Sequence, residues 1–367
     1  MPSTSDHASP DNSQTLIERA GTLGRIRLNR PKALNSLTLE MVRDIEAALD
    51  EFEADPRIAA ILVTGEGERG LCAGGDIRAI HDGGKAGNRE PETFWREEYR
   101  LNARIGRLVK PYVVFMDGIV MGGGVGLSAY GSHRIVTERT RLAMPETGIG
   151  FFPDIGASWF LTRQPGELGT YMALTGEPLG AEDTIAVGLA DFHVPSQRLP
   201  ALVDALRDLP TNASSGDVSA LVGSFHEVPA PGTLKPQRAV IDRLFSDDSV
   251  EAIFEALERE GGAFAEKTLA VLSAKSPLSL KVTLRLLHLG RRTPSLEACL
   301  EREFAATVAV LASHDFYEGV RAAVIDKDRN PQWRPARLAE VTEADIAPYF
   351  RPAAEPLFSN IKGEAIE

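Results

Sequence analysis

Residues 58–76 read IAAILVTGEGERGLCAGGD, an apolar run that passes directly into a glycine-rich stretch. Consecutive apolar residues from Ile58 to Val63 are typical of a strand that is buried on both faces of a sheet. The same order returns where Pro111 to Met116 is apolar and Met121 to Ser128 is glycine-rich and opens a helical segment. This repetition of strand, glycine loop and helix predicts an α/β layered fold with parallel strands.

The segments around this unit carry further periodic signals. Alternating residues with a break at Gly24 predict a β-hairpin over 15–29. Thr38 is placed to cap a helix that runs to about Ala54, because apolar residues recur there at helical spacing. The remaining pattern predicts a strand at 134–137 and helices at 94–110 and 161–175.

The pattern changes to a mainly helical one from about Arg238. We expect a disordered tail at 1–12, a core over 13–227, a Pro/Gly-rich linker at 228–237 and a mainly helical region over 238–367. Helical periodicity in that last region covers 250–259, 263–273, 277–289 and 296–311.

Composition excludes several classes of protein. The hydrophobic fraction of 43% and charged fraction of 25% fit a globular protein, and no apolar run approaches the ~20 residues of a membrane helix. A net charge of −12 without a basic stripe argues against a nucleic-acid partner. Cys72 and Cys299 are too few for a disulfide framework, and we expect buried thiols. With no secretory pattern in the first dozen residues, the expected location is the cytoplasm.

Common catalytic signatures are missing or out of context. Gly65, Gly67 and Gly70 match a dinucleotide-binding pattern, but Gly70 runs on into LCAGGD and does not open a helix. The sequence contains no phosphate-binding loop of the G-x-x-x-x-G-K-[ST] type and no G-x-S-x-G elbow. The seven histidines form no i, i+4 pair, so we expect no metal site.

An acidic pair stands out in the segment from Met144 to Gly156. Glu146 and Asp154 lie there among aromatic, Gly and Pro residues. Burial beside Phe151 and Phe152 would raise the pKa of a carboxyl group, which suits a general acid or base near neutral pH. The alternative is that Glu146 caps a helix or ties down a loop.

Two glycine runs, Ala73-Gly74-Gly75 and Gly122-Gly123-Gly124, follow apolar strands. Glycine lets backbone amides approach a ligand closely, and two such loops can donate to one carbonyl oxygen as an oxyanion hole. Tight packing is the alternative for either run taken alone. Their joint presence with the acidic pair favours chemistry at a thioester or an enolate.

Four runs in this order resemble the signature of the crotonase superfamily. They are Arg30 to Asn35, Cys72 to Ile77, Asp117 to Gly124 and Pro145-Glu146. The segments 94–99, 144–154, 314–321 and 325–329 are similar to those of the 3-hydroxyisobutyryl-CoA hydrolases within it. The resemblance implies a spiral of ββα units with a C-terminal helical region, and an acyl-CoA as substrate with no separate cofactor.

The resemblance also implies roles for individual residues. Ala73 and Gly123 would hold the thioester oxygen, and Glu98 would bond a substrate hydroxyl, a surface helix charge being the alternative. CoA would lie along two loops, with Lys32 or Arg30 near its phosphates, a solvated loop charge being the alternative for either. Its contacts would come from Lys32, Ala33, Leu34, Ala73, Gly75, Asp76 and Ile77.

One departure separates two possible activities. The hydratases of this family carry a first catalytic Glu two positions after the glycine run, where this chain has Val125-Gly126. The hydrolases lack this Glu. They carry an Asp eight residues past the second Glu, and this chain has Asp154 eight residues past Glu146. We therefore expect hydrolysis of a short 3-hydroxyacyl-CoA, as in valine catabolism, with a single-glutamate hydratase or isomerase as the alternative. The resemblance leaves a homo-oligomer open.

Overall fold

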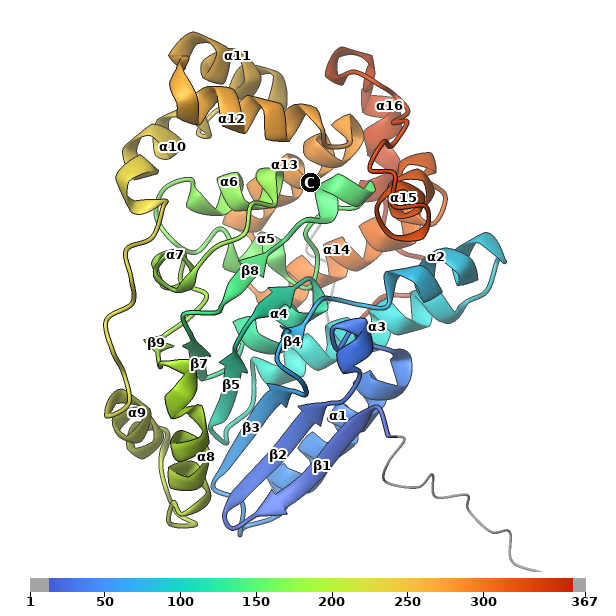
Figure 1. Cartoon of the computed structure of the whole chain (residues 1–367). Coiled ribbons are helices and arrows are strands. Elements are labelled where there is room, and N and C mark those ends of the chain that lie inside the picture. Colours follow the sequence, from blue (N-terminus) through green and yellow to red (C-terminus); the bar gives the residue numbers. More distant parts are fainter. Residues whose placement is uncertain (1–12, 359–367) are drawn as a thin grey trace, which may run out of the picture.

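A six-stranded sheet forms the centre of the computed structural model, which describes residues 13–358 (Figure 1). Its strand order is β1-β2-β3-β5-β7-β9, antiparallel between the first two strands and parallel thereafter. The strands are β1 (Thr15–Ala20), β2 (Leu23–Leu28), β3 (Ala60–Gly65), β5 (Tyr112–Met116), β7 (His133–Val136) and β9 (Phe192–His193).

A second sheet of three short parallel strands stands beside the first. It has the order β4-β6-β8, with β4 (Gly70–Cys72), β6 (Ile119–Met121) and β8 (Arg141–Ala143). Each of these strands follows a strand of the large sheet after a short turn, so β3-β4, β5-β6 and β7-β8 repeat one unit. That repetition is the spiral of ββα units that the sequence led us to expect.

The first part of the chain contributes helices that lie around the two sheets. They are α1 (Leu39–Ala54), α2 (Ile77–Lys85), α3 (Glu90–Ile105), α4 (Gly123–Ala129), α5 (Ala157–Phe160), α6 (Leu168–Thr175), α7 (Ala181–Ala186), α8 (Leu199–Arg207) and α9 (Ser215–Gly223). Short 3₁₀ turns include η2 (Pro31–Ala33), η3 (Glu146–Ile149), η4 (Ser196–Arg198) and η5 (Lys235–Gln237).

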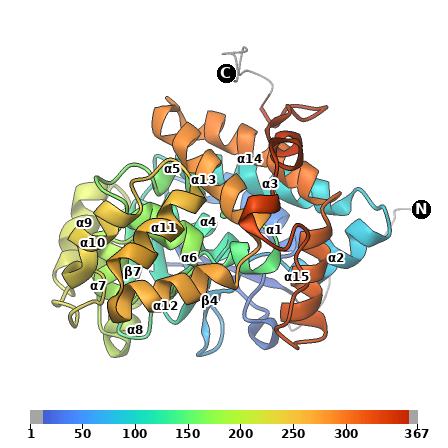
Figure 2. The same ribbon diagram turned by 90° about the horizontal axis from the view of Figure 1, so that it is seen from above.

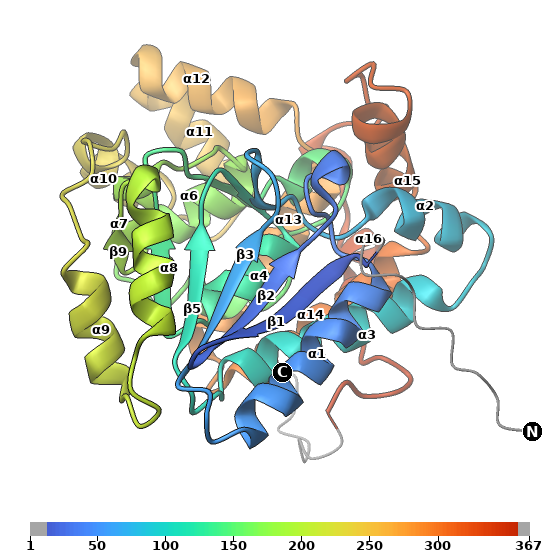
Figure 3. The ribbon, with the colours of Figure 1, turned by 60° about the horizontal axis from the view of Figure 1, so that its bottom comes forward.

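Alternation along the strands divides the sheet's side chains between two apolar layers. In β3, Ala60 and Leu62 pack with α8 and α9, whereas Ile61 and Val63 pack with α1 and α3. This follows from the two-residue period of a strand, and it explains why the whole run from Ile58 is apolar. Figure 3 shows α8 on one side of the sheet and α1 and α3 on the other.

The last third of the chain is helical and gathers at one end of the molecule (Figures 1 and 2). Its helices are α10 (Arg238–Leu244), α11 (Val250–Glu260), α12 (Gly262–Ser273), α13 (Pro277–Arg292), α14 (Leu296–Val310), α15 (His314–Val320) and α16 (Glu343–Ile346), with a π-helical turn η6 (Arg321–Ile325) and 3₁₀ turns η7 (Leu338–Glu340) and η8 (Ala347–Phe350). Buried side chains of these helices join the larger apolar cluster of the α/β part. The two regions therefore share one core.

Most of the predicted elements are confirmed. The hairpin is β1-β2, and Thr38 caps α1 by accepting a hydrogen bond from the Met41 amide at 3.2 Å. Both cysteines are buried and free. The predicted tail at 1–12 and the end of the helical region at 359–367 lie outside the described residues.

Two predictions need correction. The helix predicted at 161–175 begins later than expected, because α5 ends at Phe160 and α6 covers Leu168–Thr175. Pro165 and Gly166, the latter at a φ of +84°, separate them. The helix predicted at 94–110 begins earlier and ends earlier, over 90–105.

None of the described helices is both long and apolar enough to cross a bilayer.

Gly319 in α15 gives a test of how closely the C-terminal helices pack on the α/β part. A Cβ at this position would collide with the backbone of Ile149 in η3. We predict that Gly319→Ala lowers the free energy of unfolding by about 1–3 kcal/mol in urea titrations, although Ala is the better helix former. Gly223→Ala in α9 is the matched control, because no atom lies within 4 Å of its Cβ position. Equal effects of the two substitutions would contradict the packing.

Candidate active site

A pocket of about 100 Å³ opens between the two glycine runs and the acidic segment. Elements far apart in the sequence build it: the turn after β4, helices α2 and α3, the turn before α4, and η3 with the loop that follows it. The lining residues are Ala73, Gly74, Gly75, Ile77, Ile80, Phe94, Trp95, Glu98, Met121, Gly122, Gly123, Pro145, Glu146, Ile149, Phe151 and Asp154. The sequence-predicted Glu98, Gly123, Glu146 and Asp154 are thus brought together.

The glycines of the second run leave room for two carboxyl groups. A Cβ at Gly123 would collide with Oε1 of Glu98, and a Cβ at Gly122 would lie 3.2 Å from Oε1 of Glu146. Gly122 also has a φ of +45°, which a residue with a side chain rarely adopts. These positions need glycine because the two carboxyl groups lie directly over the turn.

Hydrogen bonding corrects the prediction for the amide of Ala73. This amide donates to the Leu34 carbonyl at 3.0 Å, so it is already paired inside the loop. Within the described part of the chain, the amides of Gly75 and Gly123 have no acceptor, and a Cβ at Gly123 would lie 3.5 Å from the Gly75 nitrogen. The two unpaired amides that adjoin in the pocket are therefore those of Gly75 and Gly123.

Three carboxyl groups are buried in this pocket. Glu98, Asp154 and Glu146 are only 2%, 5% and 6% exposed. Oε1 of Glu98 and Oε2 of Glu146 are buried and have no hydrogen-bond partner among the described residues. Because buried polar atoms are normally satisfied, these two oxygens are available to accept a hydrogen bond from a polar ligand. Burial also excludes the alternative of Glu98 as a surface charge.

Burial shifts the acid–base properties of all three groups. Loss of hydration raises the pKa of Glu98 and of Glu146 well above the ordinary value, and the nearby Asp154 carboxylate adds to both shifts. Loss of hydration raises the pKa of Asp154 to about 7. A group with such a pKa exchanges protons near neutral pH, which is what acid–base catalysis requires.

Tyr99 is a site residue that the sequence reasoning missed. Its hydroxyl donates to Oδ2 of Asp154 at 2.6 Å and opposes the rise in the pKa of that carboxyl group. Tyr99 follows Glu98 in α3, and both side chains are buried. Only the three-dimensional fold brings Asp154 to this hydroxyl, so no local pattern could have indicated it.

The predicted CoA-contact loops adjoin each other, and the second of them lines the same pocket. Arg30 donates to Oδ2 of Asp76 at 2.9 Å and thereby joins the loop before α1 to the loop before α2. Lys32 and Ala33 are exposed, whereas Leu34 is half-buried. Arg30 is thus engaged in an ion pair, and Lys32 remains the exposed cation of this loop. Gly75 and Ile77 line the pocket itself.

Aromatic side chains form the apolar wall of the pocket. Trp95 and Phe151 stack with ring centroids 5.6 Å apart, and Phe151 stacks on Phe152 at 4.6 Å. Behind them lies Phe316 of α15, which is fully buried. The C-terminal helices therefore support the wall that would face an acyl group.

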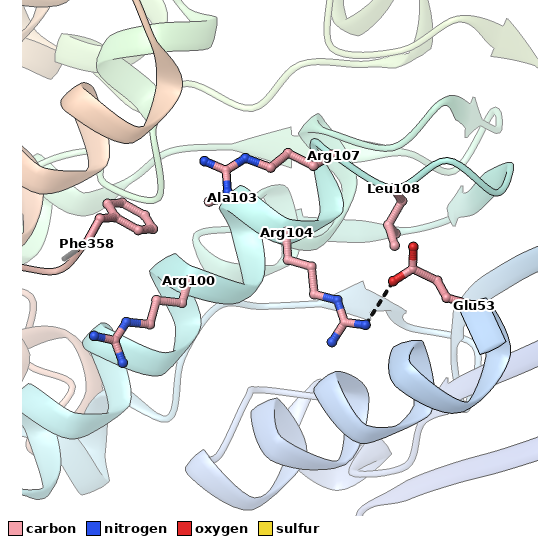
Figure 4. A pocket seen from close by; sticks show the side chains of 7 residues that line it. All are labelled: Glu53, Arg100, Ala103, Arg104, Arg107, Leu108 and Phe358. Carbon is pink, nitrogen blue, oxygen red and sulfur yellow. Dashed lines mark hydrogen bonds and ion pairs between the residues drawn. The ribbon is translucent and has the colours of Figure 1, made fainter. Parts of the chain in front are cut away.

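A second pocket, of about 340 Å³, lies on the outer side of α3 (Figure 4). Three arginines line it, but Arg104 pairs with Glu46, Asp50 and Glu53, and Arg107 pairs with Glu297. Because acidic side chains pair with two of the three arginines, this pocket offers less to an anion than its arginines suggest. The first pocket, with its unpaired amides and carboxyl oxygens, is the better candidate.

Comparison with known proteins adds a family and several relatives. The family model described as enoyl-CoA hydratase/isomerase matches residues 23–350. A zebrafish (Danio rerio) protein named 3-hydroxyisobutyryl-CoA hydrolase, mitochondrial, is 47% identical over 94% of this chain and 91% of its own length. The human (Homo sapiens) protein of that name is 42% identical over 92% of this chain and 88% of its own length.

Solved structures share the fold. A carnitinyl-CoA dehydratase from Mycobacterium thermoresistibile superposes with a TM-score of 0.89 and 43% identity, covering 96% of this chain and 100% of its own. An enoyl-CoA hydratase from Rhodobacter sphaeroides gives a TM-score of 0.84 and 39% identity, covering 93% and 98%. The names of these two structures and those of the curated relatives describe different reactions.

The raised pKa of Asp154 has a consequence for stability. Because the folded-state pKa of about 7 exceeds the ordinary value of 3.8, this group's contribution to stability falls as pH rises from about 4 to about 7. We predict that Asp154→Asn raises the free energy of unfolding by roughly 2–4 kcal/mol at pH 8 and by less at pH 5, measured in urea.

Asp217 is the matched control for this prediction. Hydrogen bonds from Ser214 lower the pKa of this carboxyl group, so Asp217→Asn should destabilise the protein at pH 8. An equal gain at both pH values for Asp154→Asn would contradict the assigned shift.

Proposed function

The chain belongs to the enoyl-CoA hydratase/isomerase family, and we propose that it hydrolyses a short 3-hydroxyacyl-CoA, with 3-hydroxyisobutyryl-CoA as the substrate. The products are the free 3-hydroxy acid and CoA. One observation carries the proposal: three buried carboxyl groups face a pair of unpaired backbone amides in one pocket. The vertebrate relatives named 3-hydroxyisobutyryl-CoA hydrolase support this choice of substrate.

The amides of Gly75 and Gly123 hold the thioester oxygen in this proposal. Negative charge develops on that oxygen when the acyl carbon is attacked, and each fixed donor contributes roughly 3–4 kcal/mol in measured cases. Gly123 was expected in this role, and Gly75 replaces Ala73 because of the bond from Ala73 to Leu34. The turn before α4 adds the positive end of a helix beside Gly123.

Glu146 acts at the acyl carbon by one of two routes. As a nucleophile it forms a mixed anhydride, expelling the CoA thiolate, which takes up a proton; water then cleaves the anhydride and restores the carboxylate. As a general base it removes a proton from the attacking water instead. In both routes Asp154 orients the water or carries a proton, and its pKa of about 7 suits either task.

Glu98 binds the 3-hydroxyl group of the substrate. Its unpartnered Oε1 lies over Gly123, so it faces the same turn that holds the thioester oxygen. A hydroxyl group donating to this oxygen would satisfy it. The aromatic wall of Trp95 and Phe151 encloses the short acyl chain.

CoA lies along the two loops at the pocket mouth. Lys32, Ala33 and Leu34 of one loop and Gly75, Asp76 and Ile77 of the other are the proposed contacts. We propose no cofactor beyond the CoA moiety of the substrate. The cytoplasmic location stays a prediction, and the relatives carry the word mitochondrial in their names. Self-association also stays a prediction.

A hydratase or isomerase that uses Glu146 alone is the second candidate, and the names of the two solved structures favour it. The site lacks the second acid that a two-glutamate hydratase would need. Val125 is fully buried, and a Cβ at Gly126 would lie 2.8 Å from Asn102 Nδ2, so such an enzyme would have to work with Glu146 alone. With crotonyl-CoA, loss of the enoyl absorbance without thiol release would support this alternative.

Glu146→Gln tests the proposed function. The variant should lose at least about a hundredfold in the rate of thiol release from 3-hydroxyisobutyryl-CoA, because an amide is neither base nor nucleophile. Glu51→Gln, on the exposed face of α1, is the matched control and should keep the rate. A near-normal rate for Glu146→Gln would refute both routes. A single turnover in ¹⁸O-water then tests the anhydride route, since label enters Glu146 only when an anhydride forms and water attacks its Glu146 carbonyl.

A further inference from the structure

Glu303 is a buried acid that the proposed reaction does not use. It belongs to α14, is fully buried and does not line the pocket. We propose that Glu303 is a positioning residue that holds the turn bearing Asp154 in the conformation needed for thioester hydrolysis. This inference rests on the proposed function.

The turn after Asp154 needs an external support. Ile155 and Gly156 have φ values of +56° and +86°, and a left-handed conformation is unfavourable for Ile. The helix that follows, α5, has four residues and no side-chain cap from its own N-cap residue, Gly156. Such a segment keeps its shape only when its surroundings hold it.

Glu303 supplies this support with both of its carboxylate oxygens. Oε2 accepts the Gly156 amide at 2.6 Å, and Oε1 accepts the Ser158 amide at 2.8 Å and the Ser158 hydroxyl at 2.5 Å. Three donors thus converge on a side chain that lies 145 or more positions away in the sequence. The cap of α5 comes from α14.

Two tyrosines hold the same turn from other sides. The Tyr130 hydroxyl donates to the Ile155 carbonyl at 2.7 Å, and the Tyr99 hydroxyl donates to Asp154 itself. Together with Glu303, the two tyrosines form hydrogen bonds with Asp154, Ile155, Gly156 and Ser158, and so hold this segment in place. Glu303 is the only charged group of the three.

Simple stabilisation does not account for a carboxylate at this place. Within residues 13–358 no cation pairs with Glu303, and the titratable groups that act on it or are affected by it are Asp154, Tyr99, Tyr130 and Cys299. An unpaired buried charge is costly, and a second acid nearby adds repulsion. Glu303 accepts three hydrogen bonds from the turn that follows Asp154, and the carboxyl group of Asp154 lines the pocket.

Glu303→Gln tests the inference, because an amide nitrogen would meet an N–H or O–H donor where an acceptor is needed. We expect kcat for thiol release to fall by about tenfold to a hundredfold, with KM within about twofold of its normal value. In an Asp154→Asn background the same substitution should lower kcat by less than about twofold more, since its effect passes through Asp154.

Asp183→Asn is the matched control. Asp183 is also a buried acid that accepts two backbone amides and a hydroxyl, those of Thr233 and Leu234, but it does not line the pocket. It should lower the melting temperature and leave kcat unchanged. If Glu303→Gln behaves like Asp183→Asn, or if its effect on kcat is fully retained beside Asp154→Asn, the inference is overturned.

A crystal structure of Glu303→Gln separates failure of this inference from failure of the proposed function. Absence of thiol release by the unaltered protein would defeat the proposed function alone. The crystal structure supports the positioning role if Asp154 has left the Tyr99 hydroxyl, and it overturns that role if residues 154–158 are unchanged.

Discussion

The burial of three carboxyl groups in one small pocket is the constraint on which the rest of this structure depends. No cation forms an ion pair with Glu98, Glu146 or Asp154 in the described part of the chain. Each group therefore loses hydration without gaining an ion-pair partner, although the positive charge of Lys275 opposes part of the rise in the pKa of Glu146. The fold is less stable for this burial. Proteins accept such a cost at sites of function, because the same burial brings the pKa of an acid to the pH at which it must work.

Two features of the fold place these acids. The glycine turn lets their carboxyl groups lie close to the backbone, and the C-terminal helices pack against the segment that carries Glu146 and Asp154. Glycine in the turn before α4 lets Glu98 and Glu146 lie over backbone amides that would otherwise be covered by side chains. The C-terminal helices then hold the acidic segment from behind, through Phe316 on the aromatic wall and Gly319 against η3. Because these helices share the core of the α/β part, they belong to the active-site structure and are more than an appendage.

The sequence predicts those features that are encoded locally. The apolar run from Ile58 to Val63 indicates a buried strand without reference to the rest of the chain. Thr38 in the same way predicts the start of α1. Glu146 and Asp154 were found through their unusual apolar neighbours and the family resemblance. The break between α5 and α6 is also encoded locally, in Pro165-Gly166, and the predicted helix ran across it.

Other features depend on contacts between distant segments. Which amide of the first glycine run is unpaired depends on the Leu34 carbonyl, so Ala73 and Gly75 could not be told apart in advance. Tyr99 and Glu303 meet the Asp154 turn only after folding. A crystal structure of Glu146→Gln with bound 3-hydroxyisobutyryl-CoA tests the central claim most directly. The account predicts the thioester oxygen at about 2.7–3.1 Å from the nitrogens of both Gly75 and Gly123. A thioester oxygen that contacts neither amide would contradict it.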